Sequence, residues 1–540
     1  MLFFRALWNI LRLPLLPFWL LGRIVGRPRS PWLHVRVRSQ VVEMPDPRSR
    51  LARFLPSLAR RMPTSLHVLR KLARFVERDP RVRGVLVTLP PLAIGWGRAR
   101  GLRDVLVRLR AGGKQVAVYL PEGATHKELY VASAADRILA PPQASIIALG
   151  LSVQATYFKP LLDKLGIRVE RFARAEYKTA AESLTRETMS DAQREQVEAL
   201  LKGFESELRG GLAARTDLER LYARGFMRGE DARALGVLDA VAYEDQLAAE
   251  LMPDAPKPRL LRADRYFAYR SNRFFRPLWR KSSLGVVSVR GAIMPGPRSE
   301  RVIAALRIAR RDKRIKGVLL HVDSPGGSAA TSDSIHREVV RLKEAKPVVA
   351  FFGDVAASGG YYVAAPATTI VAQPTTITGS IGVVSARFEA STLLEKVGVR
   401  SETLRTAPHA DMLSPTRAMS EAERAILERE MESHYGDFVA LVAEGRGRDV
   451  EAIEAVARGR VWSGTDALAH GLVDELGDLG TAEGILARAA GVEGLELVPI
   501  EPRRLDVPAE PSSAPARALL EMLARDLVIA YYEPAIPRIR

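Results

Sequence analysis

Short runs of β-branched and aliphatic residues alternate along the chain with amphipathic stretches, and this alternation occurs twice. Apolar residues recur at helical spacing over residues 99–109 in the first half and 332–343 in the second. The strand-like runs that flank them are 84–89 with 116–120, and 317–322 with 348–352. Strands that alternate with helices at this spacing predict right-handed crossovers and a mostly parallel sheet in each half.

The two halves are related by a direct repeat with a nearly constant shift. Residues 130–138 align with 362–370 at a shift of 232, and residues 78–86 align with 311–319 at a shift of 233. A repeat this long indicates two similar domains rather than a solenoid of short units. The length of 540 residues suits two domains of roughly 200 residues with additional segments.

Further elements complete the predicted organisation. A basic, aromatic stretch at 259–280 joins the halves, long helices are predicted at 192–208 and 421–441, and a proline-rich stretch at 506–516 precedes an apolar helix at 517–532. We therefore expect an α/β protein with five regions. These are a membrane-anchoring segment (1–30), the first repeat (45–257), a connector (258–282), the second repeat (283–500), and a linker with a tail helix (506–540).

The amino-terminal segment has the character of a membrane anchor. It is rich in leucine and aromatic residues and has no acidic residue before Val42, while Arg5, Asn9 and Arg12 fall on one face of a helix. A membrane-spanning helix needs about 20 apolar residues. The longest stretch between arginines, 13–22, contains two prolines and only ten residues. This pattern favours an interfacial anchor, with a tilted span, a signal anchor or a buried segment as alternatives.

Composition and charge narrow the classes of function. The net charge of +19 is typical of proteins that bind an anionic membrane surface or nucleic acid. It could also reflect simply an arginine-rich composition. Because no nucleic-acid-binding motif is visible, we expect no nucleic-acid partner. Cysteine is absent, which excludes disulfides and thiolate chemistry. The eight histidines are scattered and His-Glu-x-x-His is missing, so we expect neither a metal ion nor another cofactor.

Two glycine-rich loops follow predicted strands of the second repeat, where functional groups of α/β sheets collect. One is Asp323-Ser-Pro-Gly-Gly327, and the other leads to Ser358 and Gly359. Small neighbours leave the Ser358 hydroxyl uncrowded, and glycine amides can approach an oxyanion closely. Ser358 is therefore a candidate nucleophile, although the same residues could simply allow tight packing. At the shift of 232, His126 stands in its place in the first repeat.

Four motifs of the second repeat occur in the order typical of one family. They are Asp323–Gly327, Ala356–Tyr362, Thr378–Val383, and Gly459–Gly464 followed by Gly471–Asp474. Together they resemble the signal peptide peptidase A, or protease IV, family in its long, duplicated bacterial form. The resemblance implies two repeats with a fold similar to Clp protease and the crotonases. It also implies a membrane-associated serine endopeptidase that cleaves apolar peptides such as residual signal peptides, a homotetramer, and the periplasmic side of the bacterial inner membrane.

The resemblance also assigns roles to residues. The long form takes its general base from the first repeat, in a Tyr-Lys-Ser/Thr-Ala context that Lys178 fits, whereas Ala410 stands at the equivalent position of the second repeat. Ser358 would be the nucleophile, and the amides of Gly327 and Gly359 would bind the oxyanion. Lys178 can act as a base only if burial between the repeats lowers its pKa toward roughly 7 to 8.

Three alternatives remain at the level of sequence. A histidine triad would use His321 with Asp323, or else His336 or His409, although His321 precedes the glycine loop and is expected to pack in the sheet. A crotonase-like acyl-CoA enzyme would share the glycine-lined oxyanion hole without needing Ser358 and Lys178. A non-catalytic membrane scaffold would keep the repeats and tolerate loss of either residue.

Overall fold

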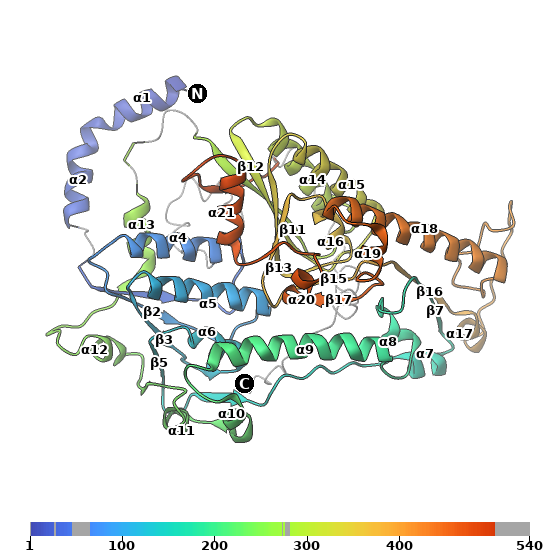
Figure 1. The fold of residues 1–540 in the computed structure, drawn as a ribbon, viewed down its shortest axis with the longest axis horizontal. Helices are drawn as coiled ribbons and strands as arrows, with labels where there is room; N and C mark the ends of the chain where they lie inside the picture. The colour runs from blue at the N-terminus through green and yellow to red at the C-terminus, as the bar shows by residue number, and fades with distance from the viewer. Residues whose placement is uncertain (1, 26–28, 46–64, 273, 276–280, 503–540) are drawn as a thin grey trace.

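The computed structural model describes residues 2–25, 29–45, 65–272, 274–275 and 281–502, and the predicted linker and tail helix at 506–540 lie outside the described residues (Figure 1). The described chain is a mixed α/β structure built around two largely parallel sheets. The strand-like runs and the four helical stretches predicted inside the repeats are all present, which confirms the expected α/β class.

The sheet of the first repeat has the strand order β10-β1-β2-β3-β5-β9, and all of its pairings are parallel. Its strands are β1 (Trp32–Arg36), β2 (Gly84–Thr88), β3 (Gln115–Tyr119), β5 (Arg137–Ala140), β9 (Ala240–Val241) and β10 (Leu261–Arg262). Two of these strands, β1 and β10, come from outside the range 45–257. One strand of this sheet thus comes from the stretch between the anchoring segment and the first repeat, and another comes from the connector.

The second repeat has the same topology. Its parallel strands are β11 (Ser283–Arg290), β12 (Ile315–Ser324), β13 (Val348–Ala357), β14 (Thr369–Ala372), β18 (Glu475–Leu476) and β19 (Leu497–Pro499). The extended end of β13 continues through β15 (Ile377–Gly379) to the antiparallel β17 (Val461–Ser463). A separate small sheet of β4 (Gly123–Ala124), β6 (Ser145–Ala148) and β8 (Gly225–Met227) is its counterpart in the first repeat.

Helices cover the sheets (Figure 1), and several of the longer ones begin at a residue whose side chain caps the first turn. The long helices are α4 (Leu66–Glu77), α5 (Trp96–Ala111), α9 (Asp191–Leu212), α14 (Pro297–Arg311), α15 (Ala329–Lys343), α18 (Glu421–Arg446) and α21 (Leu479–Ala489). Ser190 caps α9, Ser328 caps α15, and Ser420 forms a capping box with Glu423 at the start of α18.

Shorter helices fill the connections between strands. They are α6 (His126–Ala132), α7 (Lys159–Leu165), α8 (Glu182–Thr185), α10 (Leu218–Arg224), α11 (Gly229–Ala234), α12 (Leu247–Leu251), α13 (Ala263–Ser271), α16 (Gly359–Ala364), α17 (Ser391–Lys396), α19 (Val450–Glu454) and α20 (Gly464–Ala469). Central strands such as β2 and β12 are buried on both faces, as expected where helices flank a parallel sheet.

The repeats are joined by an antiparallel strand pair that reaches from one to the other. β7 (Arg168–Ala173) of the first repeat pairs along its whole length with β16 (Val384–Glu389) of the second. Glu170 and Arg387 face each other in this pair, and both side chains are buried and form an ion pair. The segment that follows β7 is thereby placed against the second repeat, where the candidate site lies.

The amino-terminal segment forms α1 (Leu2–Arg12), a short 3₁₀ turn η1 (Leu13–Leu15) and α2 (Leu16–Val25). The Arg12 guanidinium donates to the carbonyl of Phe274 at 2.9 Å, and that of Arg23 donates to the carbonyl of Tyr269 at 3.2 Å. Both helices are thus docked on the connector through their basic side. Within the part of the chain that the structure describes, no helix combines the length and the apolar character that a bilayer crossing requires.

Candidate active site

Ser358 stands at the turn between β13 and α16 in a strained backbone conformation. Its φ of 52° is unusual for a residue with a side chain and costs about 1 to 3 kcal/mol. The turn is held because the Ser358 amide donates to the carbonyl of Gly379, at 2.9 Å. A side-chain carbon at Gly360 would lie 2.5 Å from the carbonyl oxygen of Ser324, so only glycine allows this close approach.

The structure brings Lys178 of the first repeat to Ser358 of the second. The Lys178 Nζ lies 3.0 Å from Ser358 Oγ, 2.8 Å from the carbonyl oxygen of Ser380 and 2.9 Å from Ser380 Oγ. Lys178 is 5% exposed, and burial lowers its pKa to about 7. A neutral amine has two N–H groups and one lone pair, so donation to the two Ser380 oxygens directs the lone pair toward the Ser358 hydroxyl.

Ser380 is a residue that the sequence interpretation did not single out. It lies in the Thr378–Val383 motif and has a φ of 50°, like Ser358. Its amide donates to the carbonyl of Arg460 at 2.7 Å, which fixes the turn. Two of the three hydrogen-bond partners of the lysine amine therefore come from one strained residue. The only sign of Ser380 in the sequence is that it is a serine inside a glycine-rich motif. Such a motif does not reveal the direction of the Ser380 carbonyl.

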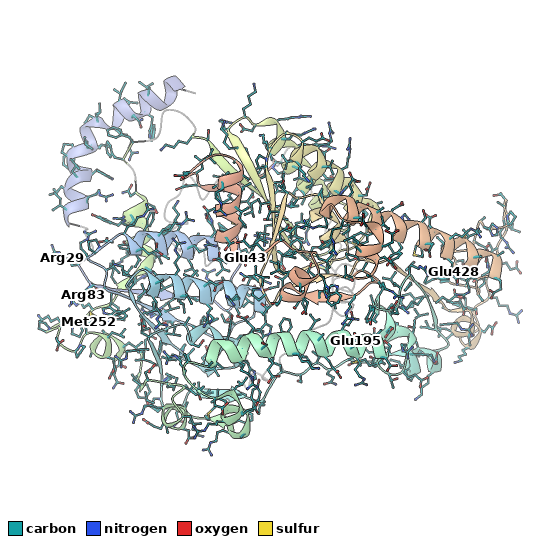
Figure 2. The ribbon with its side chains drawn as sticks, viewed as in Figure 1. Arg29, Glu43, Arg83, Glu195, Met252 and Glu428 are labelled. Atoms are coloured by element: carbon teal, nitrogen blue, oxygen red, sulfur yellow. The ribbon has the colours of Figure 1, made fainter. Side chains whose placement is uncertain are left out.

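The loop that carries Lys178 is clamped against the second repeat. Glu176 pairs with Arg458 at 3.1 Å, and the Arg460 guanidinium lies 4.8 Å from the ring centre of Tyr177. Glu195 on α9, labelled in Figure 2, accepts hydrogen bonds from both Tyr177 and Arg460 at 2.7 Å. These contacts fix the lysine backbone at the boundary between the repeats.

A buried amide completes the clamp. Gln196 Nε2 donates to the Tyr177 carbonyl at 3.3 Å and to Thr179 Oγ1 at 2.9 Å. Its Oε1 accepts from the Val461 amide of the second repeat at 3.2 Å. Gly459 must be glycine here, because a side-chain carbon would lie 2.5 Å from the Lys178 amide nitrogen. One side chain thus links the lysine loop to β17.

The two predicted oxyanion glycines lie beside the serine. Gly326 and Gly327 have φ values of 100° and 151°, which glycine adopts readily. A side-chain carbon at Gly326 would lie 2.6 Å from the Gly359 amide nitrogen, and one at Gly359 would lie 3.3 Å from the Gly327 amide nitrogen. The amides of Gly327 and Gly359 are therefore close together on the side of the turn that carries Ser358.

The candidate histidines are engaged elsewhere. His321 is buried in β12, where its Nδ1 lies 3.3 Å from Ser288 Oγ and its ring stacks on Phe351. His336 packs edge-on against Tyr362, and His409 Nδ1 lies 3.7 Å from Glu423. This arrangement agrees with the expectation that His321 packs in the sheet, and it gives Ser358 a lysine rather than a histidine as its side-chain partner.

In the equivalent turn of the first repeat, side chains of the same repeat occupy the hydrogen-bonding groups. His126 Nε2 accepts a hydrogen bond from the Gly150 amide at 3.1 Å. Glu128, which stands where the second repeat has Gly360, accepts from the Leu92 amide at 2.5 Å and from the Thr125 amide at 2.8 Å. The loop that corresponds to the oxyanion glycines therefore donates to an internal carboxylate.

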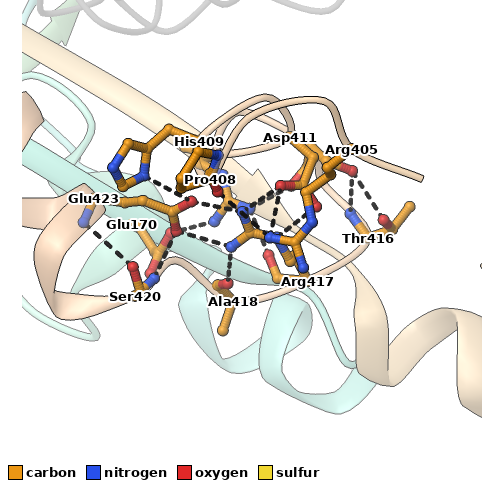
Figure 3. Close-up of polar contacts among 12 residues, drawn as sticks. Glu170, Arg405, Pro408, His409, Asp411, Thr416, Arg417, Ala418, Ser420 and Glu423 are labelled. Carbon is orange, nitrogen blue, oxygen red and sulfur yellow. Dashed lines mark hydrogen bonds and ion pairs between the residues drawn. The ribbon is translucent and has the colours of Figure 1, made fainter. Parts of the chain in front are cut away.

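The loop of the second repeat that corresponds to the Lys178 loop makes its own set of ion pairs. Ala410 is exposed, and Arg417 binds Asp411 at 2.7 Å and Glu423 at 2.6 Å (Figure 3). The hydrogen bonds from Arg417 hold the pKa of the Glu423 carboxyl well below its usual range. This loop thus carries a local ion-pair network where the first repeat carries Lys178.

Known proteins match both repeats. The model of peptidase family S49 matches residues 108–256 and 340–493. The chain is 32% identical over 438 residues to the chloroplastic serine protease SPPA of Arabidopsis thaliana, an alignment that covers 77% of this chain and 64% of that protein. It is 30% identical over 510 residues to Protease 4 of Salmonella typhi, covering 89% of this chain and 82% of that protein.

A third relative matches a shorter stretch at higher identity. The putative signal peptide peptidase SppA of Enterococcus faecium is 40% identical over 176 residues, which is 32% of this chain and 51% of that protein. The similarity to Protease 4 runs over most of the chain, as expected for a long, duplicated form. Since the family match also includes segments of both repeats, the chain belongs to peptidase family S49, whose relatives here include serine proteases.

Proposed function

We propose that this chain is a membrane-associated serine endopeptidase whose active site is a Ser–Lys dyad divided between the repeats. The observation that carries the proposal is the 3.0 Å approach of Lys178 Nζ to Ser358 Oγ in a buried site. Membership of a peptidase family favours this chemistry over that of an acyl-CoA enzyme. Activity measurements on the dyad variants below separate an enzyme from a scaffold.

In the proposed reaction, Ser358 Oγ attacks the scissile carbonyl carbon while Lys178 Nζ takes its proton. The carbonyl oxygen becomes negative and is stabilised by the amides of Gly327 and Gly359. Collapse of this intermediate breaks the peptide bond, and the Lys178 ammonium returns the proton to the leaving amine. Water then hydrolyses the acyl-serine with the same lysine as base, which regenerates the free hydroxyl.

Burial supplies the energetic condition for this mechanism. Lowering the lysine pKa from 10.5 to about 7 corresponds to roughly 5 kcal/mol of lost charge stabilisation. The contacts that enclose the amine, including the β7–β16 pair and the Gln196 clamp, come from both repeats. Neither repeat alone encloses the lysine, so the proposed base exists only in the docked chain.

Apolar peptides are the proposed substrates, and residual signal peptides are the example that we favour. The support is family membership together with the name of the Enterococcus faecium relative, a putative signal peptide peptidase. A membrane-bound enzyme would meet such peptides where they are released. The amino-terminal helices fit this location, because Leu11, Phe18 and Ile24 are 66%, 73% and 70% exposed on a segment without acidic residues.

The repeat symmetry also supports an oligomer of identical chains. A shift of 232 residues relates β16 to residues 152–157 and β7 to residues 400–405, and in the described structure both of these segments lie outside the strands. All of 400–405 is exposed. If 400–405 of one copy paired with 152–157 of the next, the β7–β16 contact would recur between chains. A head-to-tail contact forms a ring when its rotation divides a full turn, and among such rings we favour the tetramer.

Loss of either dyad side chain should abolish peptidase activity. Ser358→Ala removes the nucleophile and Lys178→Ala removes the base, so each should lower kcat/KM on an apolar peptide by roughly 10⁴-fold or more. Lys178→Arg should be equally inactive because a guanidinium stays protonated. Unchanged circular dichroism and thermal melting would serve as the folding control. Substantial activity in any of these variants would refute the dyad.

Activity should rise with pH through an apparent pKa near 7. Lys178 is the competent base only when neutral, and burial lowers its pKa to about 7. The rate should therefore be low at pH 5.5, half-maximal near pH 7 and level above about pH 8. A pH–rate profile of kcat/KM measures this. A titration near neutral pH that persists in Lys178→Met would instead implicate a histidine.

Cysteine cross-linking can test the proposed chain-to-chain strand pair in a chain that has no native cysteine. The β7–β16 register, shifted by 232 residues, places Thr156 opposite Ser401. Oxidation of a chain carrying Thr156→Cys and Ser401→Cys should give disulfide-linked multimers. The control is Thr156→Cys with Arg405→Cys, about 13 Å out of register. Absence of cross-links in the first variant, or equal cross-linking in both, would contradict the pairing.

Deletion of residues 1–29 should release the protein from membranes while hydrolysis of a soluble peptide continues. The exposed apolar side chains of α1 and α2 precede the first strand of the repeat and lie far in sequence from the dyad. Flotation with anionic phospholipid vesicles measures the binding, with Leu11→Glu plus Phe18→Glu in the full chain as the matched variant. Truncated protein that still floats would assign the anchor to another segment.

A further inference from the structure

A bulge in the strand that leads to Ser358 turns a carboxylate toward the other repeat. β12 and β13 are in parallel register up to Val322 and Phe352, and the register resumes with Ser324 opposite Ala356. β13 thus has two additional residues between these pairs. Asp354 lies in this bulge, four residues before Ser358, and its side chain is 10% exposed.

The Asp354 carboxylate caps a helix of the first repeat. The Gly95 amide donates to Asp354 Oδ2 at 3.1 Å, and the Arg98 amide donates to Asp354 Oδ1 at 2.8 Å. These amides belong to the first turn of α5, where an anion is favoured. A side-chain carbon at Gly95 would lie 2.3 Å from the carboxyl carbon of Asp354, so the helix begins with glycine to admit it.

The side chain of Arg98 connects the same helix to both segments of the candidate site. Its guanidinium forms an ion pair with Asp354 and lies 3.7 Å from Asp323 Oδ2. Asp323 immediately precedes the oxyanion loop, and its Oδ1 accepts a hydrogen bond from the Val355 amide at 3.4 Å. One first-repeat arginine therefore contacts the residues from which the glycine loop and the serine turn both start.

A third carboxyl group near this cluster does not compete for the arginine. Glu43, labelled in Figure 2, is 3% exposed. Burial, followed by the charge of Asp354, raises its pKa to about 8. Glu43 is therefore mostly uncharged at neutral pH, which leaves Asp354 as the main ion-pair partner of Arg98, since burial and the charge of Asp354 also raise the pKa of Asp323.

The contact occurs only on the side of the repeat pair that has the serine. The first-repeat counterpart of Asp354 is the exposed Glu122, and that of Asp323 is Pro90. Conversely, α15 is capped by its own Ser328, where α5 has Gly95. The group that caps α5 is thus supplied by the other repeat, whereas α15 is capped from within its own. If the cap served only the folding of each repeat, it would not need to come from the other one.

We infer that Arg98, together with the amino end of α5, is a positioning residue that holds the Ser358 turn and the Gly327 loop in register for acyl transfer. The first repeat then supplies the base, Lys178, and also the contacts that position the nucleophile and the oxyanion site. This inference rests on the proposed peptidase function. It predicts a loss in the chemical step rather than in substrate binding or in the pKa of Lys178.

The test compares Arg98→Met, Arg98→Lys and the control Arg100→Met. Arg100 lies on the same helix with a similarly exposed side chain, but it pairs within the first repeat, with Asp104 and Glu207. We expect Arg98→Met to lower kcat by about 10- to 100-fold, because displacement of reacting groups by about 1 Å has effects of this size. KM should change by less than about threefold, the pH midpoint should stay near 7, and Arg98→Lys should recover part of the loss.

Active-site titration with a serine-reactive phosphonate separates the possible outcomes. A wild-type kcat per folded chain in Arg98→Met would overturn the inference. A loss of activity that unfolding explains and that Arg100→Met shares would overturn it as well. Should Arg98→Met not fold, Asp354→Asn is the second variant, since it keeps the acceptor oxygen and the size but removes the charge. Its kcat should fall in the same way. Wild-type protein that is not labelled at Ser358 would overturn the proposed function, and the inference with it.

Discussion

In the proposed mechanism a lysine amine must be neutral near pH 7, and the rest of the structure has to meet this requirement. Water stabilises an ammonium strongly, so the amine must be removed from solvent without gaining a carboxylate partner. Lys178 meets both conditions, because its three hydrogen-bond partners are uncharged oxygens and its side chain is almost fully enclosed. The cost is comparable with the whole stability of a typical domain, so contacts between the repeats such as the β7–β16 pair must offset it.

Duplication distributes this task between two similar folds. The second repeat keeps a strained serine turn and open glycine amides, whereas the equivalent turn of the first repeat is closed by Glu128. The first repeat keeps the lysine loop, whereas the equivalent loop of the second repeat is tied by Arg417 to Asp411 and Glu423. Each unused copy has become a locally satisfied polar structure, so neither leaves buried groups without partners at these positions.

Much of the fold and part of the site could be predicted from the sequence. Alternating periodicity located the central strands and long helices, and the family resemblance brought Lys178 and Ser358 into one hypothesis. The β7–β16 pair, the role of Ser380 and the Arg98–Asp354 contact were not predicted. They depend on how two folded units dock, on the direction of a carbonyl and on a two-residue bulge. Local sequence patterns carry little information about such features.

The division of the lysine and the serine between repeats has a consequence for biosynthesis. Translation delivers the amino-terminal repeat first, and domains generally fold as they emerge. A nascent chain that has exposed only this repeat contains Lys178 without Ser358, and the amine is then open to water with an ordinary affinity for protons. Only after release and docking of the carboxy-terminal repeat are the proposed nucleophile and base assembled. Under the proposed mechanism, a half-made molecule therefore lacks peptidase activity.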